Sequence, residues 1–173
     1  MTTDAAVTAE QTALVEEATK KSGLVWVDGQ ALWHAWVDDA MCVVGGGGAE
    51  QPLPPGLADG GRAEVVVRSK DKGGRLVAWT ARVALLPPGG DAWEAAVSEL
   101  KAKRLNSVDA DTVTERWSRD CRVFRLTPDG PPHQHPSAMP ATSLAAAPTP
   151  TPATTRHPIP PALPKLLTRR RKG

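Results

Sequence analysis

The chain has 173 residues, and its 21 lysine and arginine residues against 19 aspartate and glutamate residues give a formal net charge of +2. This length allows one domain of ordinary size with an appendage. No stretch approaches the ~18 apolar residues of a membrane-spanning helix, and residues 1–11 lack the cationic and apolar regions of a signal peptide. We therefore expect a cytoplasmic protein without a membrane span.

The composition changes sharply near Gly130. Residues 131–173 contain 11 of the 17 prolines, 6 of the 21 basic residues and none of the acidic residues. Such a segment cannot bury enough apolar surface to offset the entropy of ordering it. We therefore predict a folded domain over 1–130 and a disordered basic tail over 131–173. The tail is a candidate for contact with nucleic acid or another polyanion, although contact of this kind is usually non-specific.

The first half of the folded part predicts one helix and three strands. A helix is expected over 8–21, where a narrow apolar stripe precedes two lysines. Three apolar runs follow, separated by Asp28-Gly29 and Asp38-Asp39. Because Asp-Gly between apolar runs is a hairpin signal, the runs predict antiparallel strands at 24–27, 31–37 and 40–44.

The second half begins with a glycine- and proline-rich segment, 45–61, which predicts a long loop. Apolar and polar residues then alternate with a period of two over 62–86, around a polar turn with two glycines, which is typical of a β-hairpin. A helix over 91–105, a short helical turn over 111–117 and a strand over 121–126 complete the pattern. We predict an α+β fold, a small antiparallel split β-barrel of about six strands with two or three helices.

This order of elements resembles the pyridoxamine 5′-phosphate oxidase-like family of split-β-barrel flavin-binding proteins. The resemblance spans roughly residues 8–128, and VWVDGQ at 25–30 matches the first hairpin of that family. It implies that the protein binds FMN or a deazaflavin and acts as an oxidoreductase on a small molecule. It also implies a homodimer in which two barrels form the flavin site at their interface.

The candidate cofactor-binding residues come from three parts of the predicted barrel. Cationic and hydroxyl side chains bind phosphate, an indole stacks on a flat ring, a histidine supplies a hydrogen bond, and glycine N–H groups can cradle an anion. The candidates are Arg68, Ser69 and Lys70 at the hairpin tip, Trp79, Arg82 and His34 in strands, and Gly46 and Gly47 in the loop. Each has a simpler interpretation: solvated cations at the turn, Trp79 in the core, a structural His34 and a loop that binds nothing. Arg82 has two possible orientations, because an inward side chain would need a buried carboxylate or a ligand anion, whereas an outward one is merely solvated.

The loop after the third predicted strand departs from the family pattern. The family offers basic or hydroxyl side chains there, whereas this chain has GGGGAEQPLPPG, in which Glu50 opposes an anion. The alternative hypothesis is therefore a flavin-free binding or interaction module on the same barrel, with a basic tail that contacts polyanions. The sequence has no motif of hydrolytic catalysis and no metal-ligand spacing, and Cys42 and Cys121 are predicted to be free thiols.

Overall fold

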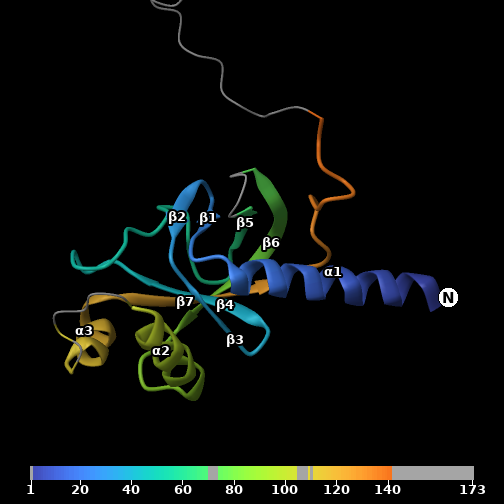
Figure 1. The fold of residues 1–173 in the computed structure, drawn as a ribbon. Helices are drawn as coiled ribbons and strands as arrows, with labels where there is room; N and C mark the ends of the chain where they lie inside the picture. Colours follow the sequence, from blue (N-terminus) through green and yellow to red (C-terminus); the bar gives the residue numbers. More distant parts are fainter. Residues whose placement is uncertain (1, 70–73, 105–108, 110, 142–173) are drawn as a thin grey trace, which may run out of the picture. The chain divides into compact units, whose positions relative to one another are not determined.

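The computed structural model describes residues 2–69, 74–104, 109 and 111–141. Within the compact unit Met1–Pro140, the described residues form three helices and one antiparallel sheet, which confirms the α+β prediction (Figure 1). The elements are α1 (Thr2–Lys21), β1 (Val25–Val27), β2 (Gln30–Leu32), β3 (Ala35–Val37), β4 (Ala40–Gly45), β5 (Arg62–Arg68), β6 (Arg75–Leu86), α2 (Asp91–Lys103), α3 (Val113–Asp120) and β7 (Arg122–Pro128).

The sheet has seven strands in the order β2-β1-β5-β6-β7-β4-β3. Its two edge strands, β2 and β3, are consecutive in the chain and are separated by Trp33 and His34 alone. A link of two residues can join opposite edges only if the sheet curls until these edges approach each other. The curled sheet confirms the predicted barrel-like architecture, with seven strands where the sequence suggested about six.

The additional strand arises because the predicted strand 31–37 is divided at Trp33 and His34. There the side chain of Gln51 forms hydrogen bonds of the kind that a neighbouring strand would otherwise form with the backbone. Its Oε1 accepts a hydrogen bond from the Trp33 backbone N–H at 2.8 Å, and its Nε2 donates to the carbonyl oxygens of Trp33 and Val44, each at 2.9 Å. The chain can leave one edge of the sheet here because its backbone polar groups remain bonded.

Two tight turns were predicted correctly. Asp28 and Gly29 have φ values of 46° and 83°, and Asp38 and Asp39 have φ values of 45° and 60°. Positive φ at both central residues matches the twist of the flanking strands in two-residue hairpins. Helix α1 begins at Thr2, earlier than the expected start at residue 8.

The sheet separates two apolar cores. Inside the curl, Val15 and Ala18 of α1 pack with strand residues that include Val65 and Trp79. On the other side, α2 and α3 lie together beside β4 and β7 (Figure 1). Strand β4 is buried along its whole length, with Met41 and Val43 in the first core and Cys42 and Val44 in the second. Its continuous apolar run is therefore the consequence of having both faces covered.

The chain after β7 continues beside β6. The His133 N–H donates to the Ala78 carbonyl oxygen at 3.0 Å, and the Ala78 N–H donates to the Gln134 carbonyl oxygen at 2.9 Å. The predicted division at residue 130 remains a prediction, since most of 131–173 lies outside the described residues. No helix in the described part of the chain is long and apolar enough to cross a membrane.

Candidate functional site

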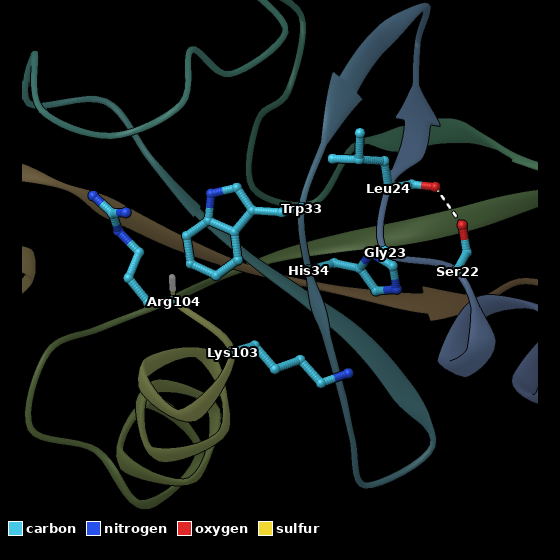
Figure 2. A pocket seen from close by; sticks show the side chains of 7 residues that line it. All are labelled: Ser22, Gly23, Leu24, Trp33, His34, Lys103 and Arg104. Carbon is cyan, nitrogen blue, oxygen red and sulfur yellow. Dashed lines mark hydrogen bonds between the residues drawn. The ribbon is translucent and has the colours of Figure 1, made fainter. Parts of the chain in front are cut away.

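A cavity of about 490 Å³ opens where three connections of the fold meet. The turn from α1 to β1, the link between β2 and β3, and the end of α2 form its walls (Figure 2). Its lining residues are Ser22, Gly23, Leu24, Trp33, His34, Lys103 and Arg104. The volume lies within the ~300–1,000 Å³ range of small-molecule sites, so this cavity is a candidate site.

His34 is the most unusual residue of the cavity wall, because it is a polar side chain with 3% exposure. Its Nε2 lies 2.9 Å from the carbonyl oxygen of Thr19, so Nε2 carries the proton and donates this bond. Nδ1 is buried, with no hydrogen-bond partner among the described residues. Burial lowers the pKa of His34 from 6.5 to about 4 against the opposing effect of the Thr19 bond, and the charge of Lys103 lowers it further. The imidazole is therefore neutral at pH 7, and Nδ1 can accept a hydrogen bond.

Two cationic side chains reach the cavity from the end of α2. Lys103 is exposed and extends toward His34 in Figure 2. Arg104 is held by Glu50, with Nε at 3.1 Å from Oε2 and 3.2 Å from Oε1. The side chain of Glu50 is 1% exposed and that of Arg104 is 22% exposed, so this ion pair is largely shielded from water. The charge of Arg104 is thus compensated within the protein, whereas Lys103 adds positive potential at the rim.

The flat surface of the site is the indole of Trp33. This ring is half-buried and packs against Trp117, with ring centroids 6.3 Å apart and planes inclined by 40°. Figure 2 shows the Trp33 ring between the side chains of Arg104 and His34. A wall that combines an aromatic ring, a neutral acceptor and a nearby cation suits a planar ligand that has an N–H donor and a negative charge.

A second cavity, of about 350 Å³, lies between α1 and the tip of the β5–β6 hairpin. It contains two of the predicted site residues, Arg68 and Ser69, and Ser22 borders both cavities. The guanidinium carbon of Arg68 lies 4.4 Å from the centre of the Trp26 ring, so a cation–π contact orients it. Lys70, predicted to join this group, lies outside the described residues.

Four other predicted site residues lie away from both cavities. Trp79 is fully buried in the core inside the sheet. Arg82 has a side chain that is 66% exposed, and its Nε lies 3.5 Å from Asp129. Gly46 donates its N–H to the Gln51 carbonyl oxygen at 3.1 Å, and Gly47 lies against the backbone of Asp120. The structure therefore brings His34 to one cavity and Arg68 with Ser69 to the other, and it does not gather the predicted set.

The sequence interpretation missed Trp33, Lys103 and Arg104 as cavity residues. Cations are favoured at a helix C-terminus, and this preference alone accounted for Lys103 and Arg104 in the sequence. A role in a ligand cavity was therefore not inferred for them. Trp33 stood inside a predicted strand, where a large aromatic side chain normally belongs to the core. Among the residues that the structure describes, no group of three or more His, Cys, Asp or Glu side chains is placed to hold a metal ion.

Comparisons with known proteins give one distant structural similarity. No family model matches the chain, and no curated protein matches it. A crystal structure of HutZ, described as the heme storage protein from Vibrio cholerae, aligns with a TM-score of 0.47 and 10% sequence identity. The alignment covers 70% of this chain and 94% of HutZ. A similarity of this size carries no functional argument, so the function has to be argued from the cavity itself.

Proposed function

We propose that the cavity lined by Trp33, His34 and Lys103 binds a small planar anion, and that this ligand is a flavin, either FMN or a deazaflavin. The observation that carries the proposal is His34, a buried side chain that lines the cavity and whose Nδ1 atom has no hydrogen-bond partner among the described residues. Leaving such an atom unpaired costs about 1–3 kcal/mol, and a ligand N–H removes that cost.

The cavity residues fit a flavin. The Trp33 indole would stack on the ring system, His34 would accept a hydrogen bond from a ring N–H, and Lys103 would attract the negative charge of the phosphate. A bound flavin supplies hydride transfer, so the proposed activity is that of an oxidoreductase acting on a small molecule. The protein's own contribution is to bind and orient the ring, and neutral His34 can do so without adding a charge.

Direct titration tests this proposal. FMN, riboflavin and a deazaflavin are added to the protein, and binding is followed by flavin fluorescence and by the shift in melting temperature that ligand binding produces. We expect Trp33→Leu to weaken FMN binding about 5-fold, since an aromatic contact contributes about 1 kcal/mol beyond its area. Lys103→Ala should weaken FMN binding about 3-fold and leave riboflavin, which lacks the phosphate, unchanged.

Lys101→Ala is the matched control, because Lys101 is an exposed cation in the last turn of the same helix but does not line the cavity. Arg68→Ala separates the two cavities: a larger loss with Arg68→Ala than with Lys103→Ala would assign the phosphate to the second cavity. The absence of binding for all three ligands would refute the flavin proposal.

A second candidate is a flavin-free binding module, and the glycine-rich loop favours it. In that loop the Gly46 N–H already donates to the Gln51 carbonyl oxygen, and the Glu50 carboxylate forms an ion pair with Arg104. A planar carboxylate without phosphate would fit the same cavity, and binding of such a compound without FMN binding would support this candidate.

The proposed assembly is the homodimer that the family resemblance implies, in the cytoplasm, and sedimentation analysis tests the dimer. The proposed role of the basic residues of 131–173 is weak contact with nucleic acid. Loss of salt-sensitive DNA binding on deletion of 131–173 would support that role.

A further inference from the structure

Glu50 lies in the glycine- and proline-rich loop after β4. Its carboxylate forms more hydrogen bonds and ion pairs than most side chains of the described residues. Its side chain is 1% exposed. It accepts hydrogen bonds from Arg104 Nε at 3.2 Å, Arg116 Nη2 at 2.8 Å and Trp117 Nε1 at 3.0 Å. A buried carboxylate is costly unless it is paired in this way, so the geometry indicates a specific role for Glu50.

The partners of Glu50 reach the ligand cavity by two routes. Arg104 lines the cavity directly. Trp117 does not line it, but its ring packs on Trp33, which does. A single carboxylate therefore holds one cationic wall residue and supports the aromatic wall residue from behind.

Gln51, the next residue, holds the same aromatic wall through its backbone. Its side chain accepts from the Trp33 N–H and donates to the Trp33 carbonyl oxygen, and it also donates to the carbonyl oxygen of Val44 in β4. These three bonds fix the link between β2 and β3, from which the side chains of both Trp33 and His34 project.

Close contacts hold this loop in place. A Cβ atom at Gly45 would lie 2.6 Å from the Gln51 carbonyl oxygen, and one at Gly47 would lie 2.6 Å from the Asp120 carbonyl oxygen. Only glycine permits these approaches, and Gly47 also has φ of 66°. In the described structure the glycines thus let the loop pack closely enough for Glu50 and Gln51 to reach their partners.

We propose that Glu50 and Gln51 are positioning residues of the ligand site, with Glu50 orienting Arg104 and Gln51 orienting Trp33. This inference rests on the proposed function, because it assumes that the cavity binds a planar anion. It assigns the glycine-rich loop an indirect role, in which the loop shapes the cavity without contacting the ligand.

FMN titration of Glu50→Gln and Gln51→Ala tests the inference. Both changes should weaken FMN binding about 10-fold, since each removes hydrogen bonds that hold a wall residue in place. Glu99→Gln is the matched control, because Glu99 is exposed on α2 and should leave affinity unchanged. A lower melting temperature with unchanged FMN affinity would show a merely structural role and overturn the proposal. Tighter FMN binding by Glu50→Gln would also overturn it, since Glu50 would then compete with the ligand for Arg104.

A measurement without ligand separates this inference from the proposed function. If the wild-type protein does not bind FMN, the proposed ligand fails, but the positioning contacts remain testable by NMR. The NMR signal of the Arg104 Nε–H proton can be assigned by its absence from the spectrum of Arg104→Lys. This proton should exchange slowly with solvent in the wild type and at least 10-fold faster in Glu50→Gln. The Trp33 amide should respond in the same way to Gln51→Ala. Rapid exchange of the Arg104 Nε–H in the wild type would contradict the inference even if neither variant folds.

Discussion

Folding stability should fall as the pH is lowered from 6.5 to 4, because His34 is buried in its neutral form. Burial lowers the pKa of His34 in the folded protein from 6.5 to about 4. As the pH drops through this window, the unfolded chain takes up a proton that the folded protein does not accept. The unfolded state therefore binds more protons, and the free energy of unfolding decreases. Above pH 6.5 the contribution of neutral His34 is fully present.

The magnitude follows from the two pKa values. Each pH unit within the window changes the free energy of unfolding by about 1.36 kcal/mol for one proton. Between pH 7.5 and pH 4.5 the linkage relation gives a loss of about 2.5 kcal/mol for a pKa of 6.5 in the unfolded chain and about 4 in the folded protein. A domain of this size has a total stability of roughly 5–15 kcal/mol, so the effect is large enough to measure.

The variant His34→Gln removes the titration, and its side-chain amide can still donate to the Thr19 carbonyl oxygen. Urea unfolding at pH 7.5 and pH 4.5 is compared for the wild type, His34→Gln and His133→Gln, where His133 is an exposed control histidine. The wild type and the control should lose about 2.5 kcal/mol more than His34→Gln. Carboxylate titration affects all three proteins and cancels in the comparison. An equal loss in His34→Gln would refute the account of His34 as a buried neutral residue.

Three further changes test the loop, a turn and a thiol. Gly47→Ala should lower stability by about 2 kcal/mol or more, whereas Gly48→Ala, which has open space around it, should lose about 1 kcal/mol from its positive φ alone; equal losses in urea unfolding would contradict the close contact. Asp39→Gly should raise stability by about 0.5 kcal/mol, because φ there is 60°; a decrease would count against the turn assignment. Burial raises the pKa of Cys42 to about 11, so iodoacetamide at pH 8 should modify it only after denaturation; mass spectrometry showing rapid native modification would disprove this.

Local signals were sufficient for most of the fold. The β5–β6 hairpin pairs Arg62 with Arg82 and Arg68 with Arg75, as the alternation over 62–86 predicts. Helix α2 begins at Asp91, where an acidic residue and helical spacing coincide. These features depend on residues that are close in the sequence, so periodicity and turn chemistry reveal them.

The candidate site could not be predicted in the same way, because it depends on contacts between distant residues. The break at Trp33 and His34 is stabilised by Gln51, which lies 18 positions away and has no local signature. Glu50 was expected to oppose an anion in an open loop, whereas its charge is neutralised by ion pairs with Arg104, which follows the last residue of α2, and with Arg116 of α3. For Arg82 the sequence left two orientations open, and the structure places it on the surface.

The central claim, that the cavity beside His34 binds a planar anion, is tested most directly by the indole N–H signals in ¹H–¹⁵N NMR spectra during titration with FMN. The account predicts that the Trp33 signal shifts on saturation while the signal of Trp26, which packs against Arg68 near the second cavity, stays in place. Unchanged signals, or a shift confined to Trp26, would contradict it.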